Sequence, residues 1–354
     1  MIPKLSHFEG QSNISIKKEI VGGQEFAIVS YIFNDSELWK NPVNLEARGI
    51  TFDANGNIVS RPFEKFFNLN ENQFTQFKDL DFTDAEYFDK VDGSMITPVV
   101  VDGKVYFKTK KSFYSDVAQS CQKDFGNDER YIKFCNVCAE YRITPIFEYT
   151  SPMNRVVVDY GTEPKLTLLA IRNNVSGIYI WRDVIVKVRD DYGIPIVEQF
   201  DINSIQDILS QDIETREGYV IRLKSGQRVK VKFPSYLLKH HTLDRMTKRN
   251  IAEMVLEECI DDFKSLVDPR HLPMIEEIEA RVVKDLEVIE EIVSDLCEVW
   301  ANDNLTLPEI GKQYSCHPFF NCAIMVHKGK DMQEMVKKHY ASKVLPLLDN
   351  IQLW

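Results

Sequence analysis

Short runs of β-branched and aromatic residues recur through the first two thirds of the chain. Turn residues separate several of them, at Asn55-Gly56, Asp102-Gly103 and Ser225-Gly226, and such turns favour antiparallel hairpins. Apolar side chains at helical spacing over residues 128–142 predict one amphipathic helix among the strands. We therefore predict an α+β segment, with strands over residues 26–33, 96–101, 105–108, 155–158, 166–171 and 219–223.

The pattern of apolar residues changes after Phe233. Between Met274 and Leu296 they recur every three or four positions, directly after Pro273, which suits the first turn of a long helix. A second helix is predicted over 330–344, ahead of Pro346. The pattern indicates an all-α C-terminal domain, and we place the two domains at residues 1–245 and 246–354.

Composition and charge narrow the class of protein. The chain has 354 residues, 44% of them hydrophobic, and a net charge of −11. Residues 251–300 hold 15 acidic and 4 basic side chains, so the rest of the chain is neutral overall and could still gather basic residues in a cleft for nucleic acid. No apolar run approaches the ~18–20 residues of a membrane span. Seven cysteines, an odd number, are typical of a reducing compartment. We expect a cytoplasmic protein, in the host cytoplasm if it is viral, with no membrane partner.

One set of short motifs carries candidate chemistry. Lys90-Val91-Asp92-Gly93 lies at a turn that leads into a strand, but Lys-x-Asp-Gly occurs by chance in roughly one in ten chains of this length, and alone it fits a solvated turn. Three further motifs follow in order: Phe147-Glu148-Tyr149, Glu217-Gly218-Tyr219-Val220 and Lys230-Val231-Lys232. The combination is typical of a lysine that attacks the α-phosphate of a nucleotide.

That reaction explains the residue types. A lysine side chain has a pKa near ~10.4 and needs nearby positive charge or desolvation to become nucleophilic. Lys230 and Lys232 alternate with Val231 on a strand, so both ammonium groups point to one face and can meet phosphate oxygens. Glu148 and Glu217, expected at strand ends, suit a hydrated Mg²⁺ or ribose hydroxyls.

The four motifs resemble those of the covalent nucleotidyltransferases, which comprise DNA ligases, RNA ligases and mRNA capping enzymes. The helical C-terminus differs from the oligonucleotide-binding barrel that follows in DNA ligases and capping enzymes. Glu46-Ala47-Arg48-Gly49-Ile50 and the stretch from Ser60 to Glu71 resemble the N-terminal signature of the ATP-dependent RNA ligases of T-even phages, the tRNA-repair type. This resemblance, over about residues 26–236, implies an antiparallel-sheet nucleotidyltransferase domain at 1–245.

The resemblance also implies a role for each matching residue. Lys90 would be adenylylated, Asp92 and Gly93 would shape its turn, and Arg48 and Lys65 would hold the departing pyrophosphate. Lys111 departs from the family, which has a glycine there. The remaining roles are ATP contact by Tyr31, AMP and metal binding by Glu148, Glu217, Lys230 and Lys232, phosphate contact by Lys108 and Lys110, and a second metal at Asp261 of the Asp261-Asp262 pair.

The expected cofactors are ATP and Mg²⁺, for which Mn²⁺ can substitute. The expected partner is RNA with 5′-phosphate and 3′-hydroxyl ends, tRNA included, and we expect a monomer. Two other functions stay open on the sequence: a ligase for single-stranded or nicked DNA, and an RNA-binding module with a degenerate site. Cys135 and Cys138 share the apolar side of the predicted helix and are interpreted as core residues rather than metal ligands.

Overall fold

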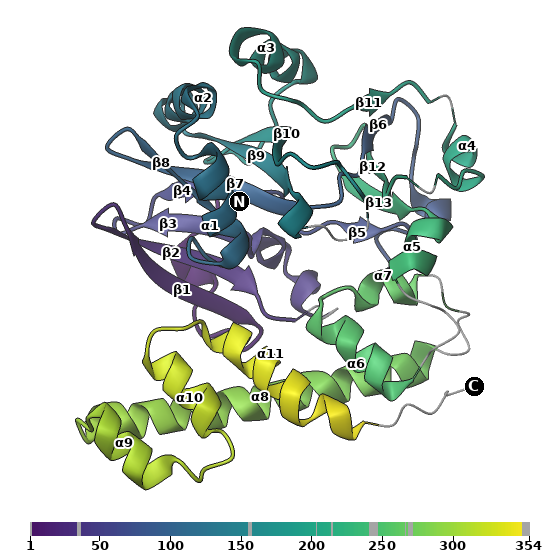
Figure 1. The fold of residues 1–354 in the computed structure, drawn as a ribbon. Coiled ribbons are helices and arrows are strands. Elements are labelled where there is room, and N and C mark those ends of the chain that lie inside the picture. Colours follow the sequence, from purple (N-terminus) through teal and green to yellow (C-terminus); the bar gives the residue numbers. More distant parts are fainter. Residues whose placement is uncertain are drawn as a thin grey trace. The chain divides into compact units, whose positions relative to one another are not determined.

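The computed structural model describes residues 2–33, 37–154, 158–202, 204–213, 215–240, 247–265, 267 and 272–348. The chain divides into two compact units, Met1–His240 and His241–Trp354, and Figure 1 traces their elements. The boundary predicted at 245/246 falls at residues outside the described set. The described strands all lie in the first unit, together with several helices, and helices make up the described part of the second.

The first sheet of the N-terminal unit has four antiparallel strands in sequence order: β1 (Ile14–Val21), β2 (Gln24–Tyr31), β3 (Arg48–Asp53) and β4 (Ile58–Ser60). The 3₁₀ turns η1 (Leu5–His7), η2 (Leu38–Lys40) and η3 (Pro42–Glu46) accompany it. Phe8, Val29, Trp39, Ile50 and Phe52 are buried in its core.

The second sheet has the order β10-β9-β7-β8, with β7 (Ser94–Val101), β8 (Lys104–Lys108), β9 (Ile143–Thr150) and β10 (Lys165–Asn173). Helices α1 (Asp116–Phe125), α2 (Glu129–Glu140) and α3 (Arg182–Tyr192) contact its strands (Figure 1). Cys135 and Cys138 lie in the core between α2 and this sheet, where they pack as apolar side chains beside Phe147.

The third sheet has the order β11-β6-β12-β13-β5. Its strands are β5 (Phe67–Asn68), β6 (Glu86–Asp89), β11 (Gln199–Phe200), β12 (Gly218–Arg222) and β13 (Arg228–Lys232), and only the β13–β5 pair is parallel. Tyr219, Phe233 and Tyr236 are buried together, which anchors helix α5 (Pro234–His240) to this sheet. The short elements η4 (Phe77–Asp79), η5 (Pro152–Asn154) and α4 (Ile205–Leu209) lie in the connections.

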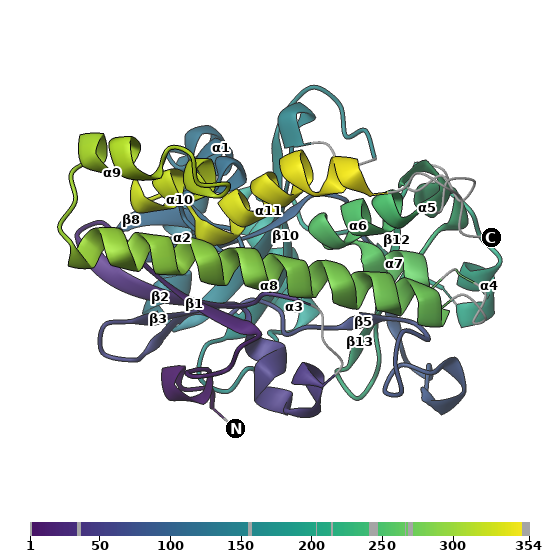
Figure 2. The same ribbon diagram turned by 90° about the horizontal axis from the view of Figure 1, so that it is seen from below.

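The C-terminal unit is built on one long helix, α8 (Leu272–Asn302), which Figure 2 shows along its length. Helices α6 (Lys248–Leu256), α10 (Phe320–His327) and α11 (Met332–Lys343) pack on α8. The unit also holds α7 (Ile260–Lys264), α9 (Leu307–Tyr314) and η8 (Leu345–Leu347). Apolar side chains spaced along α8, from Ile275 to Trp300, form its buried face.

The α+β and all-α classes predicted from the sequence are confirmed. The predicted helices correspond to α2, α8 and α11, and the predicted hairpins at Asp102-Gly103 and Ser225-Gly226 join β7 to β8 and β12 to β13. The strand predicted over 155–158 lies largely outside the described residues. Strand β1 and helices α1 and α3 were not predicted.

Candidate active site

Lys90 directly follows the last residue of β6. Its backbone N–H donates to the carbonyl of Gly218 at 3.0 Å, which extends the β6–β12 pairing by one residue. The Lys90 side chain is 19% exposed, and its Nζ lies 2.6 Å from Oε1 of Glu217. The lysine of the first motif and the glutamate of the third, 127 positions apart in the chain, therefore meet as an ion pair.

Glu217 also binds Lys232. Nζ of Lys232 lies 2.8 Å from the same Oε1 atom that contacts Lys90, so one buried carboxylate oxygen holds two ammonium groups. Burial raises the pKa of Glu217, but the charges and hydrogen bonds of Lys232 and Lys90 outweigh burial and lower it overall. Glu217 is thus an anion that brings two positive charges together.

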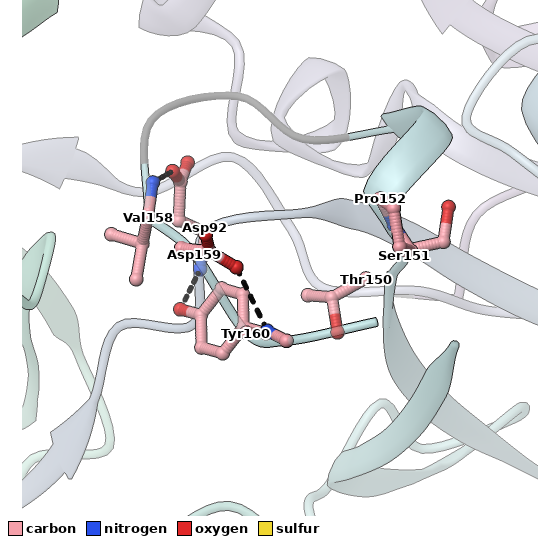
Figure 3. Close-up of a pocket in the computed structure, with 8 residues that line it drawn as sticks. Asp92, Thr150, Ser151, Pro152, Val158, Asp159 and Tyr160 are labelled. Carbon is pink, nitrogen blue, oxygen red and sulfur yellow. Dashed lines mark hydrogen bonds between the residues drawn. The ribbon is translucent and has the colours of Figure 1, made fainter. Parts of the chain in front are cut away.

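Asp92 is a buried support for the turn rather than an exposed ligand. Its Oδ1 accepts a hydrogen bond from the Tyr236 hydroxyl at 2.9 Å, and its Oδ2 accepts one from the Val158 amide at 2.9 Å. The Asp92 amide donates to the Tyr160 hydroxyl at 2.8 Å. Figure 3 shows Asp92, Val158 and Tyr160 around a small pocket that Thr150 and Ser151 also line. These bonds fix the backbone two residues after Lys90.

Gly93 completes the turn because a side chain would not fit there. A Cβ atom on Gly93 would lie 2.4 Å from the carbonyl oxygen of Tyr149 and 2.8 Å from Cγ2 of Thr150. The start of β7 therefore passes directly against the end of β9, and Ser94 pairs with Tyr149. The close approach places Glu148, on β9, beside the Lys90 turn.

Glu148 lies opposite Met95 in the β7–β9 pairing and is partly buried. Burial raises the pKa of Glu148 to about 8, with the charges of Lys90 and Arg48 opposing that rise and Glu217 and Asp92 adding to it. Both predicted metal-binding glutamates therefore lie near Lys90, but in opposite protonation states at neutral pH.

Arg48 is the first residue of β3, and a bulge determines its direction. Val29 pairs with Ile50 and Ser30 with Arg48, so Gly49 is the extra residue. Gly49 has a φ of +100°, and a Cβ there would lie 2.9 Å from the Lys110 carbonyl oxygen. The Arg48 guanidinium carbon lies 5.1 Å from the centre of the Phe66 ring.

Lys108 occupies a different environment from the other site lysines. Its side chain is fully buried, and Nζ donates to the Gly49 carbonyl at 2.7 Å. Burial lowers the pKa of Lys108 to about 7, with Glu19 opposing the shift. In this conformation the ammonium supports the β3 bulge and does not reach the surface, where a phosphate of RNA would lie.

Lys65, Lys110 and Tyr31 form an aromatic and basic group at the end of β2. Nζ of Lys110 lies 4.0 Å from the centre of the Tyr31 ring, and Nζ of the buried Lys65 lies 5.3 Å from it. Trp39 and Phe67 also face Lys65. The face of an aromatic ring stabilises a partly desolvated cation, so the rings of this group help to hold the two ammonium groups at the end of β2.

No group of three or more His, Cys, Asp or Glu side chains that could hold a metal occurs within the described residues. Asp261, in α7 of the C-terminal unit, is buried near the Lys264–Glu279 ion pair, and no observation there points to a bound metal. Glu148 and Glu217 would supply two carboxylates, which fits Mg²⁺ because that ion keeps several waters and takes further oxygens from phosphates.

The N-terminal unit thus brings Lys90, Glu217 and Lys232 into contact and places Glu148 and Arg48 within the same electrostatic environment. Lys230 lies on β13 two residues before Lys232, so both point to one face of the sheet. Sequence reasoning missed Tyr160, which is a lone tyrosine in a connection and carries no pattern that could have indicated its bond to Asp92.

Comparison with known proteins shows the family to which the chain belongs. Residues 46–238 match the family model described as RNA ligase, which is more than half of the chain, and the chain therefore belongs to the RNA ligase family. It is 28% identical over 292 residues to a candidate RNA ligase of Thermovibrio ammonificans, across 80% of this chain and 74% of that relative. It is 29% identical over 167 residues to RNA ligase 1 of bacteriophage TS2126, across 45% of this chain and 42% of the phage protein.

Among solved structures, an archaeal ATP-dependent RNA ligase aligns with a TM-score of 0.45 and 11% identity, across 78% of this chain and 76% of that one. The chain spans less than half of the phage relative's length. None of the helices in the described residues is both long and apolar enough to span a lipid bilayer.

Proposed function

We propose that this protein is an ATP-dependent RNA ligase that joins a 5′-phosphate to a 3′-hydroxyl through two adenylylated intermediates. The observation that carries the proposal is the pairing of Lys90 and Lys232 with one oxygen of Glu217. The anionic carboxylate of Glu217 holds the Lys90 amine next to a second ammonium group. That second positive charge can neutralise the negative charge of the phosphoryl group that Lys90 receives.

In the first step, Nζ of Lys90 attacks the α-phosphorus of ATP. The new P–N bond forms as the bond to the pyrophosphate oxygen breaks, and the amine loses its proton to solvent or to a carboxylate. Arg48 and Lys65 hold the departing pyrophosphate, while Lys230 and Lys232 neutralise the α-phosphate oxygens. In-line transfer depends on such positioning and charge more than on proton transfer.

In the second step, an oxygen of the RNA 5′-phosphate attacks the phosphorus of the lysine-bound AMP. The P–N bond breaks, Lys90 regains a proton, and an RNA 5′-adenylate results. In the third step, the 3′-hydroxyl attacks the 5′-phosphate phosphorus and loses its proton to solvent or to a carboxylate. AMP leaves with the electrons of the broken bond, and a phosphodiester remains. Lys230 and Lys232 stay against the AMP phosphate throughout, while Glu217 holds Lys232 in place.

A divalent cation, Mg²⁺ with Mn²⁺ as a substitute, would neutralise phosphate charge when bound. Glu148 and Glu217 are the residues that would hold it, directly or through water, because Glu217 contacts the Lys90 amine and the charge of Lys90 acts on Glu148. Asp92 and Gly93 touch no substrate in this proposal. They keep the Lys90 turn in place against Tyr149 and Tyr236.

The proposed substrate is RNA with 5′-phosphate and 3′-hydroxyl ends, and the proposed role is RNA repair, with cleaved tRNA as the substrate to test first. Lys110, on the ring of Tyr31, would contact phosphate of nucleotide or RNA. The proposed acting unit is a monomer, because all the residues named lie in one Met1–His240 unit.

A sealing assay tests the proposal. Matched RNA and DNA strands, each with a 5′-phosphate and a 3′-hydroxyl, are incubated with the protein, ATP and Mg²⁺, and products are separated on a denaturing gel. We expect joined RNA with ATP and none with GTP. Joining of DNA in preference to RNA would replace the proposal with a DNA ligase, and no joining and no lysine-AMP would favour an RNA-binding module.

A further inference from the structure

A buried cluster of charged side chains connects the segments that carry Arg48 and Lys65. We call it the arginine–carboxylate cluster. All its members lie in the N-terminal unit. They come from η3, the segment before β5, β10, the connection that follows β10, and β13. It consists of Glu46, Arg61, Glu64, Arg172 and Arg228, with the hydroxyl of Tyr179.

Glu46 closes one side of the cluster. Its Oε1 accepts from Nη2 of Arg61 at 2.6 Å and from Nη2 of Arg172 at 2.8 Å, and its Oε2 accepts from Nη1 of Arg172 at 2.8 Å. Two parallel bonds from one guanidinium fix both orientation and distance. All three side chains are at most a tenth exposed, so Glu46 is fully engaged in the protein interior.

Glu64 closes the other side and is the more exposed carboxylate, at 25%. Nη2 of Arg172 lies 2.7 Å from its Oε2, the Tyr179 hydroxyl donates to Oε2 at 2.5 Å, and Nη1 of Arg228 lies 3.9 Å from its Oε1. Burial raises the pKa of Glu64, but the combined effect of Arg172, Arg228 and Tyr179 is larger and lowers it overall. Glu64 is therefore an anion at neutral pH.

The backbone of this segment leads directly to the groups that would hold pyrophosphate. The carbonyl of Glu64 accepts a long hydrogen bond, 3.5 Å, from Nη1 of Arg48. The next residue is Lys65, whose amide donates to the Leu45 carbonyl at 2.6 Å and whose ammonium faces the Tyr31 ring. A change in the direction of the Glu64 side chain would therefore shift both cations.

The carboxylate of Glu64 balances positive charge in the cluster. Three guanidinium groups face two carboxylates, so the cluster already has one positive charge in excess. Nη1 of Arg228 is buried without a hydrogen-bond partner, and Glu64 is its nearest ion-pair partner in the described part of the chain. Without the Glu64 charge, Arg172 and Arg228 would repel each other in a low-dielectric site, and the segment would move.

We propose that Glu64 is a positioning residue for lysine adenylylation, because its carboxylate fixes the segment whose backbone orients Arg48 and carries Lys65. This inference rests on the proposed function, in which those two cations bind the pyrophosphate of ATP. Pyrophosphate leaves in the first step and is absent from the last. Glu64 should therefore matter for formation of lysine-AMP and not for sealing of RNA that already carries a 5′-adenylate.

The variant Glu64→Gln keeps the shape of the side chain and removes its charge. We expect lysine-AMP formation from ATP to slow by about tenfold or more, with an increased KM for ATP, while sealing of pre-adenylylated RNA stays within about twofold of wild type. Glu64→Asp, which keeps the charge, should lose less. Glu140→Gln, at an exposed position at the end of α2, is the matched control and should equal wild type in both assays.

A second variant tests the same inference with a smaller change to the protein interior. Tyr179→Phe removes one hydrogen bond to Glu64 and keeps the ring stacked on Phe63, 5.6 Å between centres. We expect a loss of about two- to fivefold in lysine-AMP formation alone, and this variant decides the question if Glu64→Gln does not fold.

Equal losses in both assays, or no loss in lysine-AMP formation, would overturn the inference. Those outcomes are read against a wild-type protein that forms lysine-AMP, so they leave the proposed function standing. A wild-type protein that forms no lysine-AMP would instead overturn the proposed function, and this inference with it.

Discussion

Glu148 and Glu217 both lie near Lys90, but the structure gives their carboxyl groups different protonation states. Its pKa is raised to about 8 by burial, whereas Glu217 is kept anionic by two lysines. A metal ion binds the carboxylate form, so Glu148 must lose its proton when Mg²⁺ binds. Loading of the site with metal should therefore strengthen as pH rises toward 8.

The same shift predicts a gain in stability from an inactivating substitution. Between pH 5 and 8 the folded protein holds a proton on Glu148 that the unfolded chain has lost, so this residue lowers stability as pH rises through that window. Glu148→Gln cannot ionise, and at pH 8 without metal it should unfold with a free energy on the order of 3–4 kcal/mol above wild type, because each pH unit of the window contributes ~1.4 kcal/mol. At pH 5 the two proteins should be nearly equal.

Urea denaturation at both pH values, in the presence of a chelator, measures that difference. Lysine-AMP formation by Glu148→Gln should at the same time be lost. A destabilised variant at pH 8, or the same difference at both pH values, would contradict the assigned protonation state.

Gly93 is required for space rather than for backbone conformation. The Cβ of Gly93→Ala would overlap the Tyr149 carbonyl oxygen at 2.4 Å, so β7 must move away from β9 and carry the Lys90 turn with it. We expect at least ~tenfold slower lysine-AMP formation and a loss of ~1–3 kcal/mol in stability. Gly311→Ala in α9, where nothing lies within 4 Å, is the matched control, and a Gly93→Ala protein as active as that control would refute the packing argument.

At the scale of elements, the β3 bulge connects backbone geometry to the site. Gly49 is the bulged residue, its φ is +100°, and a Cβ would meet the Lys110 backbone. Gly49→Ala should therefore disturb Arg48 and Lys110 together and slow lysine-AMP formation by about tenfold or more. Gly56, in the β3–β4 turn, also has a positive φ, but no atom lies within 4 Å of where its Cβ would be. Gly56→Ala therefore measures the stability lost to backbone strain alone.

The rate of lysine-AMP formation, measured with Tm for each variant, separates the two effects. If Gly49→Ala loses more stability than Gly56→Ala and only Gly49→Ala loses rate, the bulge has the proposed role. Equal rates in the two variants would argue against it.

The sequence predicted those elements whose apolar pattern is strong. α2, α8 and α11 follow from their helical periods, and the hairpins follow from their turn residues. Helix α3 was not predicted because many of its residues are charged and only Ile185 and Val188 are buried. Strand β1 has lysines and a glutamate in its middle, with the carboxylate of Glu19 buried against Ser112, so its local pattern does not mark it as a strand.

The motif residues of the site were predictable, but their contacts were not. Short motifs indicated Lys90, Glu217 and Lys232, since their chemistry is local in sequence. The shared oxygen of Glu217, the burial of Lys108 and the bond from Tyr160 to Asp92 depend on pairings between distant segments. Such pairings follow from the packing of three sheets, which no local pattern encodes.

At the scale of the whole molecule, the charge of the C-terminal unit restricts where RNA can bind. The exposed side of α8 carries Glu276, Glu277, Glu287, Glu291, Asp295 and Glu298. An RNA backbone is repelled by such a surface. We propose that the N-terminal unit performs the chemistry. The helical unit would influence which RNA is bound, through surfaces other than the acidic side of α8.

A truncation after His240 tests this division. The N-terminal unit has its own buried cores, and α5 must be retained because Tyr236 packs with Tyr219 and binds Asp92. We expect residues 1–240 to form lysine-AMP at a rate within about fivefold of the full chain and to seal a panel of RNAs with changed relative efficiencies. A folded truncation that forms no lysine-AMP, or one with an unchanged order of preference, would contradict the proposed roles.

The central claim is that Lys90 becomes covalently bound to AMP. The most direct measurement is mass spectrometry of the intact protein after incubation with ATP and Mg²⁺, followed by mapping of the modified peptide. We predict the addition of one AMP, located on Lys90, and none in the folded variants Lys90→Ala and Lys90→Arg, because neither offers an amine that can attack phosphorus. AMP attached to another residue, or retained in a Lys90 variant, would contradict the account.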